Sequence, residues 1–518
     1  MTSTKISNLN WRSPWLIIFI FSILGLIGIL NHSMWRDELN PWLIVKYSQS
    51  FTDLINNISY EGHPVIWYFS LAVLMSIIDN PIIMQLFHLG LAISSIIIIW
   101  LYSPFNYRQK FLFTFSYLPF YEFLLISRNY AYGMLLVFAV CVFFASRKKT
   151  YILLSLLLGL LANTNAYAVF ISFALIVTLL VELCFDIEHR NEYSQQAKKY
   201  DLIISLIIIV ASYFLAISMI TPPADSYLHG GLSDGWLTTL DIKHIFKTLG
   251  KFFGGYYLII PTSKRWLDLI GCGIIAGLTM VFTVIKLSKK PIPLFFYLLV
   301  NLEIITFAYL RFAGSGHRHF GHFYIALIAA LWLESYYPDS NLIGKIWNYP
   351  FKNYQKIFKF ACKWQHIIFM ISLYMQFFGG IYGFTRDLII PFSASRATVE
   401  YIQKNNFDNE FIVASRDANM AAISGYLNRQ LYYPELQTMG SFTLFKAGRK
   451  EVEQPEVFRQ IESLMQEKLQ VEKILLILHQ ELQSKVNNLK VIPIQKFEKA
   501  WVNTERYYLY WVQRSRPD

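Results

Sequence analysis

Asp37 and Glu38 form an acidic pair, beside Arg36, immediately after the first apolar block of the chain. A carboxylate in a sheltered site can take a proton from an attacking hydroxyl or amine, a role worth about 10² to 10⁴ in rate. The same pair can instead complement the dipole at the start of a helix, which contributes about 0.3 to 1 kcal/mol. Trp35 and Arg36 are equally compatible with an anchor at a membrane surface. Asp37 and Glu38 are therefore candidate catalytic residues, and the dipole and anchor interpretations stay open.

Two further motifs carry side chains suited to binding an anionic substrate. "EGHPV" contains His63 followed by a proline that suits the first turn of a helix, and a histidine there is as easily a residue of the membrane interface. "SRNYAYG" contains Arg128 and Tyr130, and an arginine guanidinium can bind a phosphate through two parallel hydrogen bonds. Its alternative is an arginine that reaches from a helix to the interface.

The motif "GSGHRHFGH" places His317, Arg318, His319 and His322 around a glycine-rich turn. His319 and His322 are three residues apart, so a divalent metal ion is conceivable. No carboxylate or cysteine accompanies them, and the arginine between them repels a cation. We therefore expect an anion-binding site and no metal cofactor.

The elements that position these residues are membrane helices. The chain of 518 residues is 55% hydrophobic and only 15% charged, far more apolar than a soluble domain. A helix of about 20 residues crosses a bilayer. The first apolar block has no small-residue cleavage site, so we interpret it as a retained span and not a signal peptide. We predict about 11 spans, at roughly 14–31, 81–101, 111–127, 130–146, 151–162, 166–185, 202–220, 267–286, 293–311, 320–337 and 365–384.

The net charge of +12 follows the expected topology and does not indicate nucleic-acid binding. With the N-terminus in the cytoplasm, the cytoplasmic segments hold 18 Lys and Arg residues, against 10 in the opposite segments before residue 385. The positive-inside rule therefore favours a cytoplasmic N-terminus. This count treats Pro64 to Ile78 as a segment that does not cross, since its 15 residues are marginal for a span.

The first outer loop is predicted to contain a helix that lies in the membrane interface. Apolar side chains recur along one helical face, and the segment is too short and too polar to span. The residues of this face are Leu43, Tyr47, Phe51, Leu54 and Ile58. Asp37 and Glu38 would then lie at or just before the first turn of this helix.

Residues 385–518 have the composition of a soluble domain, with 18 Lys and Arg and 16 Asp and Glu. "ATVEYIQKN" (397–405) reads as an amphipathic helix, "FIVAS" (411–415) as a buried strand and "KILLILHQ" (473–480) as a strand or short helix. We predict a small outward-facing α/β domain. Because this domain contains none of the four cysteines, no disulfide framework is implied and a bacterial inner membrane is favoured.

All of the polar motifs fall on the outer side of the membrane in this topology, including "NTNAY" (163–167) and "DSYLHGG" (225–231). Ionisable groups at a membrane are costly, so a cluster on one face indicates a functional site. A channel would distribute polar groups along the depth of several helices. One carboxylate pair and several basic clusters at the level of the lipid headgroups favour a reaction on a phosphate-linked lipid.

The order of these motifs resembles the GT-C superfamily of integral-membrane glycosyltransferases, in the branch of protein O-mannosyltransferases and aminoarabinose transferases. The resemblance covers residues 1–385: a span, an acidic pair in the first outer loop, an interfacial helix, the His63-Pro64 pair, Arg128 with Tyr130, and Arg318 to Phe320. Two departures concern subfamily and substrate: Val65 stands where the branch usually has a second proline, and Arg36 precedes the acidic pair.

The resemblance implies transfer of a sugar from a polyprenyl-phosphate carrier to a lipid, glycan or protein acceptor, with inversion at the anomeric carbon. Asp37 would be the general base, and Glu38 would orient the loop. Arg128 and Arg318, with His317 or His319, would stabilise the departing phosphate. The apolar segment after His63 would line the groove for the prenyl chain. This branch need not use a metal.

Two other functions use similar features. A glycan polymerase or ligase acts on comparable lipids but joins glycans from a diphosphate carrier. A lipid-linked sugar transporter or flippase would show inverted repeats or interrupted helices near the middle of the membrane, and the sequence shows no such symmetry.

Overall fold

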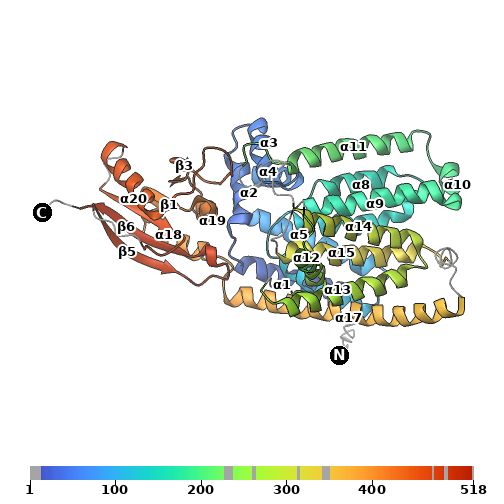
Figure 1. The fold of residues 1–518 in the computed structure, drawn as a ribbon. Helices are drawn as coiled ribbons and strands as arrows, with labels where there is room; N and C mark the ends of the chain where they lie inside the picture. Colours follow the sequence, from blue (N-terminus) through green and yellow to red (C-terminus); the bar gives the residue numbers. More distant parts are fainter. Residues whose placement is uncertain are drawn as a thin grey trace, which may run out of the picture.

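A computed structural model describes residues 13–226, 237, 239–259, 264–311, 316–340, 351–468, 472–483 and 488–515. A bundle of long helices forms one end of the molecule, and a sheet domain forms the other (Figure 1). Residues 227–231 of the motif "DSYLHGG" and residues 314–315 of "GSGHRHFGH" lie outside the described residues.

The helical part contains eight helices, among the described residues, that are long and apolar enough to cross a membrane. The protein is therefore an integral membrane protein. These eight are α1 (Pro14–Asn31), α5 (Ile82–Tyr102), α7 (Tyr130–Phe143, continued by a 3₁₀ turn η2, Phe144–Lys148), α9 (Ala166–Phe185), α11 (Asp201–Ile220), α13 (Trp266–Leu287), α14 (Pro291–Leu310) and α17 (Phe351–Ile389).

Three of the eleven expected spans take another form. The block at 111–127 is divided into α6 (Tyr107–Thr114) and a π-helical turn η1 (Leu118–Glu122), with Pro119 unable to continue the helical hydrogen bonding. The block at 151–162 is the short helix α8 (Ile152–Ala162). The block at 320–337 is α15 (His317–Leu333), followed by the 3₁₀ turn η3 (Glu334–Tyr336). Every residue of α15 from Phe320 onward is buried, so this helix lies inside the bundle.

The first outer loop contains two helices where one was predicted. They are α2 (Arg36–Tyr47) and α3 (Phe51–Ser59), and the extended backbone of Ser50 separates them. The Ser50 hydroxyl accepts a hydrogen bond from the backbone N–H of Asp53 at 3.1 Å, which caps α3. The predicted apolar face is thereby divided between two helix axes. The following segment, Pro64 to Ile78, contains only the short helix α4 (Ile66–Ile77).

Two further helices of the membrane part, among the residues that the structure describes, connect the spans. They are α10 (Ile187–Gln196) and α12 (Ile242–Tyr257). In α12 and α17, glycines permit unusually close helix contacts: a Cβ on Gly255 would lie 2.3 Å from the backbone oxygen of Phe320, and one on Gly380 would lie 2.3 Å from that of Phe115.

The C-terminal part is the expected α/β domain. Its helices are α18 (Ser395–Lys404), α19 (Asp417–Leu427) and α20 (Gln454–Ser463), with short turns η4 (Phe407–Asn409), η5 (Leu464–Lys468) and η6 (Asn503–Glu505). Its strands are β1 (Ile412–Ser415), β2 (Leu431–Tyr433), β3 (Thr438–Gly440), β4 (Lys473–Leu478), β5 (Leu489–Phe497) and β6 (Tyr507–Arg514).

The sheet has the order β3-β2-β1-β4-β6-β5, in which β1 is parallel to β2 and β4, and the other pairs are antiparallel. The segment 473–480, predicted as a strand or a short helix, contains the strand β4. Helix α17 continues to Ile389, past the boundary predicted at residue 384, and leads into this domain.

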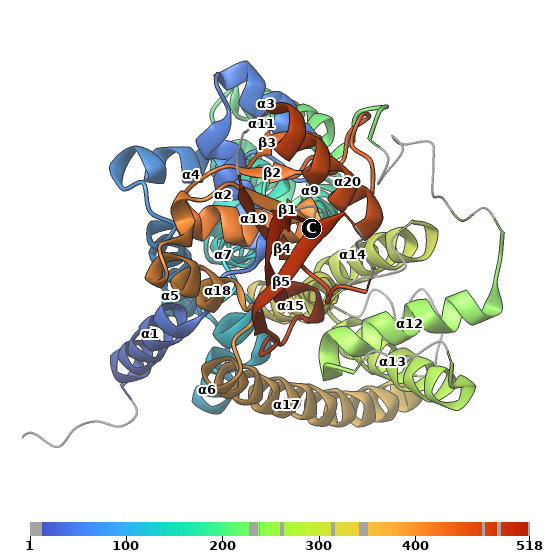
Figure 2. The ribbon, with the colours of Figure 1, turned by 90° about the vertical axis from the view of Figure 1, so that its left-hand side faces the viewer.

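The C-terminal domain sits on the end of the bundle that carries the first outer loop (Figure 2). Helix α19 packs against α2, where a Cβ on Gly425 would lie 3.1 Å from the Leu39 side chain. The helix that begins with the acidic pair is thus held between the bundle and the soluble domain.

Candidate active site

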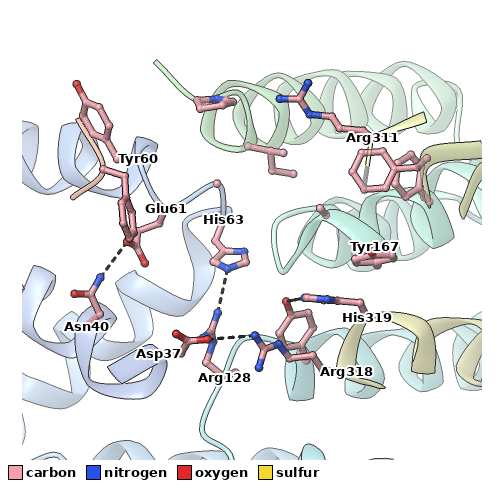
Figure 3. A pocket seen from close by; sticks show the side chains of 18 of the residues that line it. Asp37, Asn40, Tyr60, Glu61, His63, Arg128, Tyr167, Arg311, Arg318 and His319 are labelled. Carbon is pink, nitrogen blue, oxygen red and sulfur yellow. Dashed lines mark hydrogen bonds and ion pairs between the residues drawn. The ribbon is translucent and has the colours of Figure 1, made fainter. Parts of the chain in front are cut away.

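A cavity of about 1040 Å³ lies between the helical bundle and the C-terminal domain. Side chains from the first outer loop and from the membrane helices face it (Figure 3). Arg416, Ala418, Thr443 and Phe445 of the soluble domain complete its lining. The polar lining residues are Arg36, Asp37, Asn40, Tyr60, Glu61, His63, Arg128, Tyr130, Tyr167, Glu303, Thr306, Arg311, Arg318, His319, Arg416 and Thr443.

Asp37 lies in the first turn of α2, within the cavity lining. Its Oδ2 accepts a hydrogen bond from Arg128 at 2.9 Å and one from Arg318 at 3.2 Å. Arg36 Nε lies 3.7 Å from Oδ1. Burial alone would raise the pKa of Asp37, but the charges of Arg128, Arg318 and Arg36 outweigh it and hold that pKa below its usual value. The structure thus joins three residues that are up to 281 positions apart in the sequence.

Glu38 is fully buried and does not line the cavity. Its Oε1 accepts a hydrogen bond from the backbone N–H of Ser127 at 2.7 Å, and its Oε2 lies 3.0 Å from His32 Nε2. The other ring nitrogen of His32 lies 2.8 Å from Asp387. These contacts fix the start of α2 against the residue that precedes Arg128. The orienting role of Glu38 in catalysis stays a prediction.

The two carboxylates beside His32 favour its charged form. Its burial lowers the pKa, but the neighbouring carboxylates of Asp387 and Glu38 outweigh burial and raise that pKa to about 10. The last membrane helix, the first outer loop and the segment that carries Arg128 are therefore joined by one buried ionic network.

Arg128 and His63 are in direct contact, which the sequence motifs did not predict. Arg128 Nη2 donates to His63 Nε2 at 3.1 Å, which requires that this nitrogen carry no proton. The Arg128 side chain is 10% exposed, so its charge lies in a sheltered place at the edge of the cavity.

Tyr130 and His319 form the next part of the wall. The Tyr130 hydroxyl lies 2.8 Å from His319 Nε2, and the His319 ring stacks on Tyr167 with centroids 5.3 Å apart. His317 is placed differently: it packs edge-on against the ring of Tyr117 and does not line the cavity. Of the candidate residues, the cavity brings together Asp37, His63, Arg128, Tyr130, Arg318 and His319.

Glu61 is a cavity residue that the sequence reasoning missed. Glu61 lies two positions before His63 in "YEGHPV", a motif from which only the His-Pro pair was predicted to belong to the site. The carboxylate accepts hydrogen bonds from Asn40 Nδ2 at 3.0 Å and from the Tyr68 hydroxyl at 3.3 Å. Burial raises the pKa of Glu61 to about 7, despite the opposing charge of Arg128.

The part of the cavity lining that comes from α9, α11 and α14 is largely apolar. Its apolar side chains are Phe170, Ile220, Leu302, Phe307 and Leu310, and its polar ones are Tyr167, Glu303, Thr306 and Arg311. Leu302 is 62% exposed on α14. The cavity therefore combines the arginine pair with an apolar wall.

The described residues contain no group of three or more His, Cys, Asp or Glu side chains that could hold a metal ion. Arginines supply the positive charge of the cavity instead. The expectation that no metal cofactor is required stays a prediction.

Comparison with known proteins identifies the fold. No protein-family model matches the chain, and no curated protein matches it. Two solved structures of ArnT from Cupriavidus metallidurans are similar, one bound to undecaprenyl phosphate and one in the apo state. Their TM-scores are both 0.52, with 12% and 11% sequence identity, over 96% of this chain and 97% of theirs. The chain therefore has the ArnT fold across both its helical bundle and its C-terminal domain.

Proposed function

We propose that the protein is a membrane glycosyltransferase that moves a sugar from a polyprenyl-phosphate carrier to an acceptor hydroxyl or amine. The observation that carries this proposal is the pair Arg128 and Arg318, which converge on one carboxylate oxygen in a cavity that also has an apolar wall. Such a cavity suits a ligand with an anionic head and a long apolar tail. The ArnT fold supports the proposal, since one of the ArnT structures is bound to undecaprenyl phosphate.

The two arginines would bind the phosphate of the donor. Guanidinium groups suit this task because they stay charged and present several donors in a plane. In the transition state they stabilise the charge that develops on the departing phosphate. His63 and Tyr130 hold the arginine side of the cavity in place through their contacts with Arg128 and His319.

Asp37 would take the proton of the acceptor. The acceptor oxygen or nitrogen attacks the anomeric carbon, the bond from that carbon to the phosphate oxygen breaks, and the phosphate leaves with the electron pair. A single displacement of this kind inverts the anomeric configuration. Because a bound phosphate competes for Arg128 and Arg318, donor binding would weaken their pairing with Asp37 and raise its basicity.

We assign the reaction to the outer face of a bacterial inner membrane, with the N-terminus in the cytoplasm and the C-terminal domain in the periplasm. The surplus of Lys and Arg in the segments expected to face the cytoplasm supports this orientation. The cavity residues lie in the opposite set of segments, in the spans that adjoin those segments, or in the C-terminal domain, and none lies in a segment expected to face the cytoplasm.

A panel of radiolabelled polyprenyl-phosphate sugars, incubated with the purified protein, tests the proposal. We expect free polyprenyl phosphate and a labelled product with at least one donor, and a loss of about 10² to 10⁴ in rate for Asp37→Asn. Asp79→Asn is the matched control, since Asp79 forms an ion pair with Lys46 outside the cavity. Full turnover by Asp37→Asn would refute the assignment of the base.

Failure of every donor, with export of a glycolipid lost in cells that lack the protein, would favour a transporter. Turnover of diphosphate-linked glycans alone would favour a polymerase or ligase.

A further inference from the structure

We propose that Glu61 binds the acceptor, and that the C-terminal domain holds it in place through Asn40. This inference rests on the proposed function and concerns the opposite side of the cavity from the donor phosphate. Glu61 would accept a hydrogen bond from the acceptor: from the N–H of an amine, or from an O–H beside the attacking oxygen.

Glu61 is fixed by neutral groups and not by an ion pair. Its two side-chain hydrogen bonds come from an amide and a phenol, Asn40 and Tyr68, and no cation lies within 4 Å of its carboxylate among the described residues. Gly62 follows with a φ of +64°, a left-handed conformation that turns the chain between Glu61 and His63. Both side chains can therefore face the cavity from one short loop, as Figure 3 shows.

The charges of the cavity place the donor away from Glu61. A phosphate beside Glu61 would meet a second carboxylate, whereas a phosphate at Arg128 and Arg318 meets two guanidinium groups. Asp37 contacts both arginines and lies between them and Glu61 (Figure 3). A nucleophile held at Glu61 would thus stand next to the base.

Asn40 connects this carboxylate to the soluble domain. Its Nδ2 donates to Glu61 at 3.0 Å and to the backbone oxygen of Thr443 at 3.2 Å, and its Oδ1 accepts from the Thr443 N–H at 2.9 Å. All three residues line the cavity. A second link joins the same helix to the domain, since Arg36 lies 3.8 Å from the buried Glu505. The soluble domain thereby sets the orientation of an acceptor-binding group.

Water and azide distinguish acceptor binding from other roles of Glu61. Water, the smallest acceptor, can give one proton to Asp37 and a hydrogen bond to Glu61 as its oxygen bonds to the anomeric carbon. Azide attacks the same carbon through nitrogen without losing a proton or donating a hydrogen bond. In both reactions the phosphate leaves with the electron pair.

The experiment measures transfer from the polyprenyl-phosphate sugar that the wild-type protein turns over, to water and to azide. In Glu61→Ala we expect transfer to water to fall by about tenfold or more, as a lost hydrogen bond to a charged group predicts. Azide should rescue transfer in this variant, and the KM for the donor should match that of the wild type. Equal losses with water and azide, or a raised donor KM, would overturn the proposal.

Two further variants test the role and its link to the domain. Transfer to water by the wild type should decline as the pH falls through about 7, where Glu61 takes up a proton, and Glu61→Gln should lack this inflection. Asn40→Ala should reproduce part of the loss with water, while Asn56→Ala, on the exposed face of α3, should leave transfer unchanged. A normal rate in Asn40→Ala would contradict the link.

Two results distinguish a failure of the proposed function from a failure of the role of Glu61. No release of polyprenyl phosphate by the wild type with either nucleophile would refute the proposed function and this inference together. Wild-type turnover with an unaltered water rate in Glu61→Ala would refute the inference alone.

Discussion

Asp37→Asn should bind undecaprenyl phosphate more tightly than the wild type while losing turnover. In the structure, Asp37 occupies the guanidinium groups that the donor phosphate is proposed to use. An incoming phosphate must break these contacts and also approach a negative charge. Asparagine keeps the shape of the side chain but removes both obstacles, so binding and catalysis should change in opposite directions.

The size of the effect follows from the exposure of the ion pairs. The side chains of Arg128, Arg318 and Asp37 are 10%, 22% and 26% exposed, between a surface pair and a buried one. Exposed pairs contribute about 0.2 to 1 kcal/mol and charge-assisted hydrogen bonds about 1.5 to 3 kcal/mol. A total of about 1 to 2 kcal/mol for the two contacts corresponds to roughly five- to thirtyfold tighter binding.

The assay is a titration of the protein in lipid nanodiscs with undecaprenyl phosphate, followed by the tryptophan fluorescence of the protein. Trp35 is a suitable reporter because Arg318 lies over its ring, 5.6 Å from the centroid. Asp79→Asn should bind like the wild type, since its ion pair lies outside the cavity. Unchanged or weaker binding by Asp37→Asn would refute the competition between Asp37 and the phosphate.

Three other predictions concern the arginine site and the fold. Arg128→Lys should raise the KM for the donor about tenfold, because lysine cannot replace two parallel hydrogen bonds; an unchanged KM would leave Arg128 as a membrane anchor. The pKa of His32 is raised to about 10 in the folded protein, so its stabilising charge is fully present below pH 6.5 and lost as the pH rises through about 10. Thermal unfolding at a series of pH values should show this loss in the wild type and not in His32→Gln. Gly380→Ala should destabilise the fold by about 1 to 3 kcal/mol, because the added Cβ would meet the Phe115 backbone. Gly277→Ala is the control, since a Cβ there meets nothing within 4 Å. Equal melting temperatures of the two variants would contradict this packing.

Much of the architecture could be predicted because membrane spans and soluble domains differ in composition over long windows. The eight long helices coincide with apolar blocks of the sequence. The span count was less predictable, since a block of apolar residues does not reveal how its backbone is arranged. Pro119 divides one such block, and α15 is apolar on all sides because protein surrounds it.

The candidate site was predictable only where a motif stood out locally. Asp37, His63, Arg128 and Arg318 each lie in a short polar cluster within an apolar chain, and the cavity contains all four. Glu61 was missed although it lies in a cluster of this kind. Its role depends on burial and on Asn40, neither of which a local pattern reveals.

No sequence pattern indicated that residues of the C-terminal domain line the cavity. Thr443 reaches the cavity by tertiary contact with Asn40, across 403 positions of sequence. His317 illustrates the opposite error: it adjoins Arg318 in the sequence but points toward Tyr117 instead of the cavity. Neighbouring residues on a helix face different directions, so adjacency alone could not separate them.

The most direct test of the central claim is to follow the anomeric carbon of the transferred sugar by ¹³C NMR during turnover, together with the release of free polyprenyl phosphate. We expect an inverted product that appears at the same rate as the polyprenyl phosphate, and neither species at a comparable rate with Asp37→Asn. A product with retained configuration, or no release of polyprenyl phosphate from any donor, would contradict a single displacement assisted by Asp37 in this cavity.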